Sequence, residues 1–385
     1  MAVRHCRDYG AVAQAVDQLL DAVHARSLVA GERVLLKVNL MRGSAPAQAR
    51  TTHPAVVRAV LRWVRAAGGD PFVAESSGVL GFTGEVAEAA GVAQLCRDEG
   101  ADFVNLDAGP FRRVQSGGRV LGDLLLPEAV LDAPVRITLP KLKTHTLTGL
   151  TCALKNQVGI LPGGTKCAIH RVAGSPERLA QAVVDIAMAA PFHLGVVDAV
   201  VGLEGGGSAA GRPVAAGFVA GGRDLVALDA CCGRLVGFEP REVPTTVAAA
   251  ARGLGEARVG AVALDGIGDL EPLVRFARPG FDPKRLAPIG RLAYRLRERI
   301  VAPTVDRHRC QRCGECARVC PVDGIELAPG PRIGDGCVHC FACSERCPSG
   351  AMMLATPLYA RRSLRQRTRG LPLARLARTG RRWRR

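Results

Sequence analysis

The chain has 385 residues, a net charge of +17, a hydrophobic fraction of 48% and an aromatic fraction of only 4%. That length and apolar content allow one large domain with an appendage, whose core is built mainly of Val, Leu and Ala. No apolar run approaches the roughly 20 residues of a membrane helix, and the start lacks the apolar stretch of a secretory signal. The sequence therefore predicts neither a membrane-spanning nor a secreted protein.

Helices and strands are predicted to alternate through residues 1–280. Short apolar runs are followed by amphipathic stretches with helix start and stop signals, such as the helix that Pro54 opens. This alternation indicates an α/β domain with an open, mostly parallel sheet and helices on both faces. We expect strands at 33–39, 72–74, 102–106, 135–139, 193–198 and 215–219, and helices at 11–26, 54–67, 85–99, 176–190 and 225–235.

Lysine is concentrated in one segment of this domain. The chain has 46 Arg and 6 Lys, and four of the six are Lys141, Lys143, Lys155 and Lys166. A buried ammonium can lose its proton, which a guanidinium cannot, so we infer that some of these positions require lysine. The alternative is four solvated surface lysines.

The sequence around these lysines predicts an anion site. Thr148 is placed to cap a short helix, in which Thr151 and Lys155 would share a face and which Gly159 would end. A helix N-terminus with cations nearby attracts anions, so a carboxylate or phosphate substrate is expected.

Five residues of this region are candidates for direct roles. Lys143, Lys155 and Asn156 are expected to hold the anion. His145 and His170 are the candidate proton donors, and Lys155 joins them as a candidate catalytic residue. For each histidine the alternative is a structural role.

Four acids follow predicted strands or lie in loops, where sites of open α/β sheets gather. Glu75, Asp198, Glu204 and Asp229 could bind a metal or a cofactor or relay protons, although Asp229 could equally cap or pair inside a helix. Cys152 is expected to be a small buried hydrophobe. The chain shows no nicotinamide, flavin or ATP fingerprint, so electrons most simply enter or leave through the cysteine-rich region described next.

The composition changes after residue 280. Residues 281–303 are basic and amphipathic and indicate a helical connector. Residues 304–357 hold eight of the fourteen cysteines, in two copies of C-x2-C-x2-C-x3-C-P that are 27 residues apart. This is the spacing of bacterial ferredoxins with two cubane clusters. We therefore expect a small α+β domain that binds two [4Fe–4S] clusters and transfers single electrons.

The two runs are expected to exchange ligands, because the fourth cysteine of each run reaches the other cluster. The alternative is a pair of zinc knuckles, but zinc requires no x3-C-P ending. One ligand set is Cys310, Cys313, Cys316 and Cys347, and the other is Cys337, Cys340, Cys343 and Cys320.

Several motifs before the cysteine runs belong together. They are Lys37-Val-Asn39, Thr51-Thr-His-Pro54, Glu75-Ser-Ser-Gly78, the Lys141–Asn156 block, His170, Asp198, Glu204-Gly-Gly-Gly207 and Asp224–Asp229. Over about residues 30–270 the chain thus resembles the domain of unknown function 362 (DUF362) family. The resemblance implies an iron–sulfur protein of unsettled biochemical role that often carries a C-terminal two-cluster ferredoxin. Asp224 stands in R-D-L-V-A-L-D where the family usually has D-P-x-A-x-D, so Asp229 is the firmer match.

Residues 358–385 form an arginine-rich tail. Residues 361–385 contain eleven Arg and no acid, which leaves a net charge of +6 for the rest of the chain. One interpretation is a solvated, disordered extension, and another is docking on an acidic protein or an anionic membrane surface. Nucleic acid is not an expected partner, because no recognised binding module accompanies the charge.

Two functions remain open on the sequence. The first is a ferredoxin-linked oxidoreductase, in which two clusters pass low-potential electrons to a small anionic substrate in the α/β domain. The second is a non-catalytic electron carrier or assembly partner that docks onto another protein. Either would exchange electrons with a redox donor or acceptor protein, and cluster-bound thiolates favour the reducing cytoplasm.

Overall fold

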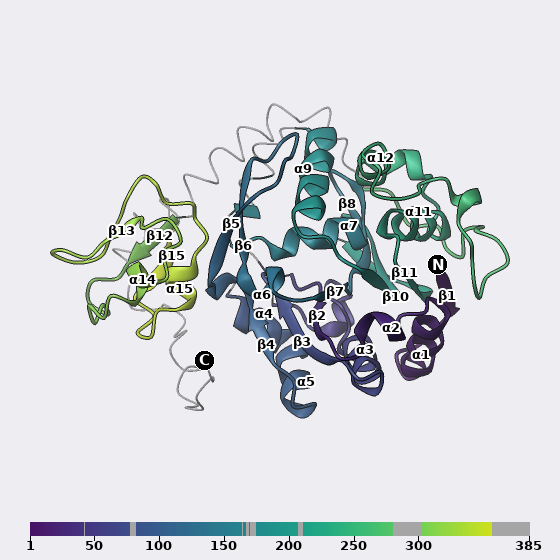
Figure 1. Ribbon diagram of the computed structural model, residues 1–385, viewed down its shortest axis with the longest axis horizontal. Helices are drawn as coiled ribbons and strands as arrows, with labels where there is room; N and C mark the ends of the chain where they lie inside the picture. The colour runs from purple at the N-terminus through teal and green to yellow at the C-terminus, as the bar shows by residue number, and fades with distance from the viewer. Residues whose placement is uncertain are drawn as a thin grey trace.

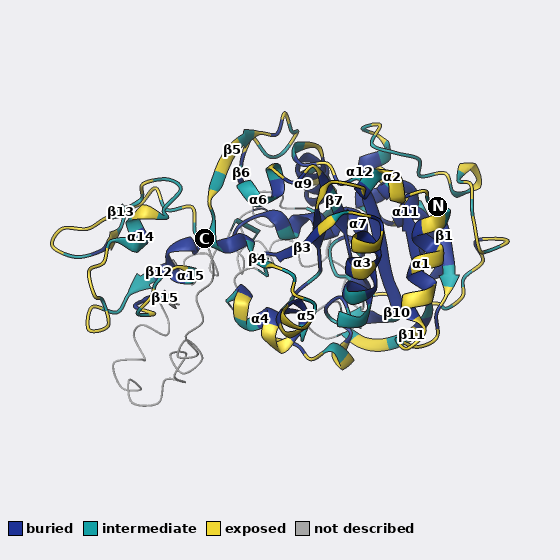
Figure 2. Ribbon diagram, turned by 60° about the horizontal axis from the view of Figure 1, so that its bottom comes forward, coloured by how far each residue is buried: buried dark blue, intermediate teal, exposed yellow. Residues whose placement is uncertain are grey.

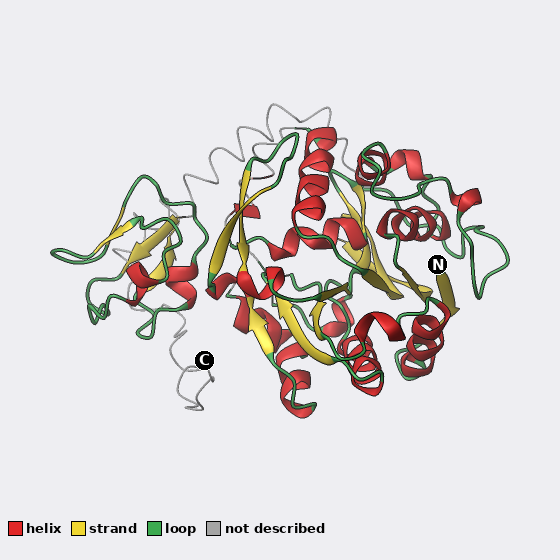
Figure 3. Cartoon of the chain, viewed as in Figure 1, coloured by secondary structure: helices red, strands yellow, loops and turns green. Residues whose placement is uncertain are grey.

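The computed structural model describes residues 1–41, 43–77, 82–163, 165–166, 169, 175–206, 211–279 and 302–355. A mixed sheet with helices on both faces forms the body, and a small cysteine-rich module lies at one end (Figures 1 and 3). The predicted α/β class is confirmed. The tail and all but the last two residues of the expected connector lie outside the described residues.

Among the described residues the central sheet has nine strands, and its main path runs β1-β11-β10-β7-β2-β3-β4. From β10 to β4 neighbouring strands are parallel, whereas β11 pairs antiparallel with both β10 and β1. β8 pairs parallel with β10 and antiparallel with β9. The strands are β1 (Ala2–His5), β2 (Arg33–Lys37), β3 (Asp70–Glu75), β4 (Phe103–Asn105), β7 (Val135–Thr138), β8 (Lys141–His145), β9 (Gly149–Thr151), β10 (Leu194–Gly206) and β11 (Gly211–Gly222).

The order of the strands reverses between β2 and β7. From β2 the chain adds β3 and β4 on one side, then crosses back and adds β7 and β10 on the other. In open α/β sheets, ligands bind at such a reversal, beyond the carboxyl ends of the strands. Lys37 ends β2 and Thr138 ends β7, so these two side chains mark the point where a site is expected.

Two hydrophobic cores cover the two faces of the sheet. Val34 and Leu36 point into one core and Leu35 into the other, as the two-residue period of a strand requires. The first core is closed by α1 (Val12–Ala22), α3 (Pro54–Ala66), α4 (Thr83–Ala89) and α5 (Val92–Asp98). The second is closed by α7 (Ala153–Asn156), α9 (Pro176–Ala189), α11 (Leu225–Leu235) and α12 (Pro244–Ala250).

The long helices predicted from the sequence are present in the structure, but one of them is divided at a glycine. The helix expected at 85–99 is two helices, because Gly91 adopts a φ of +72° between α4 and α5. A hairpin, β5 (Phe111–Gln115) and β6 (Asp123–Pro127), was not predicted. The remaining short elements are α2 (Arg26–Val29), η1 (Pro46–Gln48), η2 (Leu106–Ala108), α6 (Glu128–Leu131), η3 (Gln157–Ile160), η4 (Pro240–Glu242) and η5 (Val259–Ala261).

The cysteine-rich module repeats its backbone as well as its sequence. Positive φ angles recur at the 27-residue offset, in the pairs Arg312 and His339, Gly314 and Phe341, and Asp323 and Gly350. Each half therefore folds in the same way around its cysteines. The module comprises β12 (Ala302–Val305), α14 (Glu315–Arg318), β13 (Ile325–Glu326), β14 (Arg332–Ile333), α15 (Ala342–Glu345) and β15 (Met352–Ala355).

Candidate functional site

Five of the six lysines of the chain gather beyond the carboxyl ends of the central strands. The charges of Lys37, Lys141 and Lys155 all act on Lys143, and Lys166 acts on both Lys37 and Lys155. Four of the five side chains are buried, and Lys166 is partly buried. We call these five residues the lysine centre. This burial argues against the alternative interpretation of the sequence, in which these lysines are solvated on the surface.

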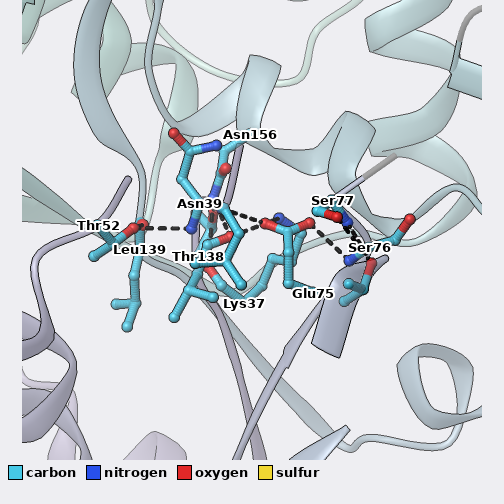
Figure 4. A network of polar contacts seen from close by, with 12 residues as sticks. Lys37, Asn39, Thr52, Glu75, Ser76, Ser77, Thr138, Leu139 and Asn156 are labelled. Atoms are coloured by element: carbon cyan, nitrogen blue, oxygen red, sulfur yellow. Dashed lines mark hydrogen bonds and ion pairs between the residues drawn. The ribbon is translucent and has the colours of Figure 1, made fainter. Parts of the chain in front are cut away.

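Lys37 and Glu75 form a buried ion pair at the ends of β2 and β3. Lys37 Nζ lies 2.8 Å from Glu75 Oε2, and both side chains are at most 1% exposed (Figure 4). Burial lowers the pKa of Lys37 to about 8 and raises that of Glu75. The backbone N–H groups of Leu40 and Ser76 also donate to the Glu75 carboxylate, which fixes its position.

Lys143 and Lys155 have no carboxylate partner among the residues that the structure describes. Lys143 Nζ donates to Asn39 Oδ1 at 2.6 Å and to the Arg50 carbonyl, both uncharged acceptors. Burial lowers the pKa of Lys143 to about 7 and that of Lys155 to about 8. A buried ammonium without a paired carboxylate is costly, and the charge of the nearby Glu75 offsets this cost only in part at Lys143. These two amines therefore favour either a bound anion or loss of the proton.

Asn156 lies over the point where the strand order reverses. Its Nδ2 donates to Thr138 Oγ1 at 2.8 Å and lies close to the Lys37 and Val38 carbonyls (Figure 4). Its Oδ1 is buried and has no hydrogen-bond partner within the described part of the chain, and the same holds for Thr151 Oγ1, which is opposite Lys143 on β9. Unpaired buried polar atoms are rare in folded proteins and require an explanation, such as a ligand.

The helix expected around Lys155 is shorter than predicted, and its N-terminus is not an anion site. Thr148 precedes β9 and caps no helix; α7 spans only Ala153–Asn156. Asp229, from α11, accepts hydrogen bonds from Ala153 N at 2.7 Å and Leu154 N at 3.2 Å. The carboxylate of the chain itself therefore occupies the place where we expected a substrate anion.

Gly159 also has a different role from the helix end that we expected. Backbone structure continues through it as η3, and its carbonyl accepts from Ser76 N at 3.1 Å. A Cβ at this position would overlap Lys37 Nζ and Glu75 Oε1. Glycine is needed here because the backbone packs directly on the buried ion pair.

Asp198 belongs to a second polar cluster beside the lysine centre. Its Oδ2 lies 2.6 Å from Lys141 Nζ, and its Oδ1 accepts from the Tyr9 hydroxyl at 3.1 Å. The His53 ring stacks on Tyr9 at 3.5 Å, and His53 N donates to Asp198. Burial and the Asp198 charge raise the pKa of Tyr9. All of these groups partner one another within the cluster, and the role of Asp198 in binding a cofactor stays a prediction.

The other sequence candidates lie at different distances from this centre. Glu204 pairs with Arg212 across β10 and β11 and accepts from Ala277 N, so it anchors a following segment. His145, at the end of β8, accepts from Leu147 N and Thr148 N through Nδ1. Its proton is thereby placed on Nε2. His170 lies outside the described residues.

Asp107 connects the lysine centre to the cysteine-rich module, and no sequence pattern marked it as a candidate. Its carboxylate accepts from Ser76 Oγ, from Thr83 Oγ1 at 2.5 Å and from Gly163 N at 2.6 Å. Ser76 Oγ also accepts from Lys166 Nζ at 2.6 Å. A continuous hydrogen-bond network thus runs from the lysine centre to the loop at Gly163.

The module contacts this network at two points. Glu345 in α15 accepts from Thr83 N and from Asn105 Nδ2, both at 2.9 Å. Gly163 packs so closely on the Cys340 carbonyl that a Cβ at Gly163 would overlap it. A cleft of about 990 Å³ between module and body is lined by both Asn105 and Cys320.

The eight cysteines lie in the two predicted groups. Four of them line one small pocket, and in the other group the pKa of Cys343 is raised to about 12, first by burial and then by its three neighbouring cysteines. Backbone N–H groups point at sulfurs, as from Gly324 to Cys320 at 3.2 Å. This donor set fits cubane clusters, whose potential such bonds tune. The first group is Cys310, Cys313, Cys316 and Cys347, and the second is Cys320, Cys337, Cys340 and Cys343.

Comparison with known proteins agrees with these features. A model of the family described as domain of unknown function (DUF362) matches residues 34–234, more than half of the chain. The chain belongs to the DUF362 family. In this DUF362 protein a model described as a 4Fe-4S binding domain also matches residues 303–326, which confirms an iron–sulfur module and its role in electron transfer.

Two individual proteins are similar to this DUF362 chain. One is a thylakoid-associated protein of Synechocystis sp., 34% identical over 225 residues, which cover 58% of this chain and 69% of that protein. The other is the lactate racemase apoprotein of Thermoanaerobacterium thermosaccharolyticum, with a TM-score of 0.42 and 13% identity. That match covers 61% of this chain and 57% of the racemase chain. Among the helices that the structure describes, none has the length and apolar character to cross a bilayer.

Proposed function

We propose that this DUF362 protein is a ferredoxin-linked oxidoreductase that reduces a small anionic substrate bound at the lysine centre. The observation that carries the proposal is the pair of buried amines, Lys143 and Lys155, without a carboxylate partner among the described residues. They lie where the strand order reverses, the usual binding point of an open α/β sheet.

Buried polar atoms without a partner in the described part of the chain support one chemical class for this substrate. Lys143 and Lys155 would bind its anionic group, a carboxylate or a phosphate. Asn156 Oδ1, which has no partner among the described residues, would accept a hydrogen bond from it, so the substrate would also carry a hydroxyl or amino group, with which Thr151 Oγ1 could pair as well. Such a molecule pairs the orphaned groups that burial makes costly.

Two [4Fe–4S] clusters would supply the electrons, one electron each. Both cysteine groups are complete, and the second group contacts the body at Cys340 and lies next to the network at Asp107. A two-electron reduction also consumes two protons. Lys143 and Lys155 are suited to donate them, because a pKa of about 7 or 8 lies near neutral pH, and His145 Nε2 is a further donor. A cytoplasmic location is part of this proposal, because a reducing compartment keeps the thiolates free to bind iron.

The test follows cluster reoxidation without oxygen. The full chain with its clusters intact is reduced, mixed with the anionic fraction of the small molecules of the host, and followed by visible absorbance. We expect faster reoxidation than with the neutral fraction. Lys155→Met should slow it by about tenfold or more, because one charged contact to the substrate is lost. Lys155→Arg keeps the charge, so it should retain binding and lose rate.

Two controls make the outcome clear. Arg178→Met removes an exposed charge outside the centre and should leave the rate unchanged. Iron and sulfide analysis of every variant should give twice the content of a single cubane. Equal reoxidation by both fractions, in wild type and Lys155→Met alike, would reject the enzyme and leave an electron carrier.

A further inference from the structure

The two halves of the module share a backbone but carry different side chains. At the 27-residue offset, Gln311 and Arg312 of the first cysteine loop correspond to Val338 and His339 of the second. In the same way Gly314 corresponds to Phe341. The first loop therefore carries the polar Gln311 and the basic Arg312, and the second carries the apolar Val338 and Phe341 beside His339, although both surround the same type of ligand set.

The second loop faces the body of the protein through its part from Cys340 to Cys343, whereas Val338 is 38% exposed. Cys340, Phe341 and Cys343 are at most 7% exposed, and Gly163 packs on the Cys340 carbonyl. Two further hydrogen bonds through Glu345 hold the same half in place. In Figure 2 the helix α15 of this half is buried, while the outer loops of the module are exposed.

The polar loop faces away from the body. Gln311, Arg312 and Cys313 are all exposed, so one ligand of the first group is reached from outside. Electron transfer between proteins requires close approach of the two centres, and an exposed ligand permits it. In the second group no ligand is exposed to this degree, because Cys340 and Cys343 are buried and Cys320 and Cys337 are partly buried.

The exposed loop carries positive charge that is free to act on a partner. Arg307 and Arg312 are exposed and have no ion pair within the described residues. The two acids nearby are engaged, because Asp306 lies 3.8 Å from Arg309 and Glu315 pairs with Arg318. The face around the first cysteine group is therefore basic.

We propose that this face is the docking surface of a separate, acidic one-electron carrier protein. Its acidic side chains would meet Arg307 and Arg312 and bring its redox centre to the exposed Cys313. One electron passes per encounter, from the reduced carrier to the first cluster, and no bond forms or breaks. The electron would then leave through the second cluster, which would be held by the cysteine group that packs on the body at Gly163. This inference rests on the proposed function in one respect only, which is that both clusters are present.

The experiment measures docking rather than turnover. Reduced plant-type ferredoxin, an acidic [2Fe–2S] protein, is mixed with the oxidised full chain in a stopped-flow instrument at low and at high salt. We expect the second-order rate of cluster reduction to fall as salt rises. Arg307→Glu with Arg312→Glu should lower the low-salt rate by about tenfold or more and remove most of its salt dependence.

A matched pair of substitutions serves as the control. Arg7→Glu with Arg241→Glu changes the net charge equally, at exposed positions after β1 and beside α12, at the opposite end of the molecule (Figure 1). That protein should keep the wild-type rate within about twofold. An equal loss in both double variants, or a wild-type rate that is independent of salt, would overturn the proposal.

A second measurement on the wild-type protein covers the case in which the charge-reversed variant fails to bind iron. An anionic paramagnetic complex in solution should concentrate near Arg307 and Arg312. There it should speed the electron-spin relaxation of the first reduced cluster more than that of the second. Equal enhancement of both clusters would contradict the asymmetry. Neither measurement involves the substrate, so the proposed reduction can fail while this inference stands.

Discussion

At the scale of single residues, the two lysines without carboxylate partners should make anion binding depend on pH. Lys143 and Lys155 have pKa values lowered to about 7 and 8, so both are cationic at pH 6 and largely neutral at pH 9. Sulfate keeps its charge over that range. We expect its affinity, measured by calorimetry, to fall by about tenfold or more between these pH values. Lys143→Met should bind weakly throughout, with a flatter profile.

The lowered pKa of Lys143 also makes the free energy of unfolding depend on pH, and this contribution rises with pH where the sulfate affinity falls. Between pH 7 and about 10.5 the unfolded lysine is protonated while the folded one is not, so the unfolded state binds more protons. The contribution of Lys143 to the free energy of unfolding therefore increases with pH across this window. A denaturation series on Lys143→Met should lack that contribution, whereas a profile identical to wild type would contradict the lowered pKa.

Gly159→Ala should destabilise the protein through the ion pair that its backbone touches. The new Cβ would overlap Lys37 Nζ and Glu75 Oε1, so a buried pair must move. Overpacking of this kind costs about 1–3 kcal/mol of unfolding free energy, measured with denaturant. Gly84→Ala is the control, because a Cβ there meets nothing within 4 Å and α4 gains a better helix former.

The sequence located part of this centre and missed the rest for a physical reason. The scarcity of lysine pointed to Lys141, Lys143, Lys155 and Lys166, and the same bias applied to Lys37 would have completed the set. Asp107 gave no signal, because an aspartate after a strand is common. Only the folded arrangement shows that it joins Ser76 to Gly163.

At the scale of elements, α7 depends on an acid from another helix. Asp229 accepts from Ala153 N and Leu154 N, and burial raises its pKa to about 7. Between about pH 4 and 7 the folded state therefore holds a proton that the unfolded state has lost, so this contribution to stability declines as pH rises. Asp229→Asn should make the fall of stability over this range less steep in thermal melts. A slope equal to wild type would contradict the raised pKa.

The pairing of β8 with β9 explains why the helix predicted to begin at Thr148 is absent. Thr148 has the properties of a helix cap, but β8 and β9 form a hairpin through it, with Lys143 opposite Thr151. The pairing of these two strands overrides the local preference of Thr148 for a helix N-terminus. Longer elements such as α3 and α11 were located closely, because their apolar periodicity extends over several turns.

At the scale of the whole molecule, Glu345 should hold the module against the body. Its carboxylate pairs with Thr83 N and Asn105 Nδ2, so Glu345→Ala would leave two donors unpaired. We expect amide hydrogen exchange at Thr83 to rise by about tenfold or more, measured by NMR or mass spectrometry. Glu326→Ala, at an exposed site of the module, is the control. Unchanged exchange at Thr83 would contradict this role.

The sequence predicted the parts of the molecule but not their assembly. Cysteine spacing indicated the module, and its repeat was visible in the 27-residue offset. Which half faces the body depends on contacts between residues far apart in the chain, such as Gly163 with Cys340. No local pattern in the sequence encodes such a contact. A local sign of it is the apolar Phe341, at the position that corresponds to Gly314 in the first half.

The small number of lysines makes the lysine centre suitable for chemical modification of its amines. Apart from Lys284 and the N-terminus, every primary amine of the chain belongs to the lysine centre. An amine near its pKa is a nucleophile, and a guanidinium is not, so the many arginines would stay silent toward an acylating reagent. Lys37 and Lys141 are fully buried, whereas Lys155 is 8% exposed and Lys166 is only partly buried. Mass spectrometry after brief acylation at pH 8, with and without a candidate substrate, would thus read the occupancy of the centre at Lys155 and Lys166. Protection of Lys155 would identify a ligand before any turnover is observed.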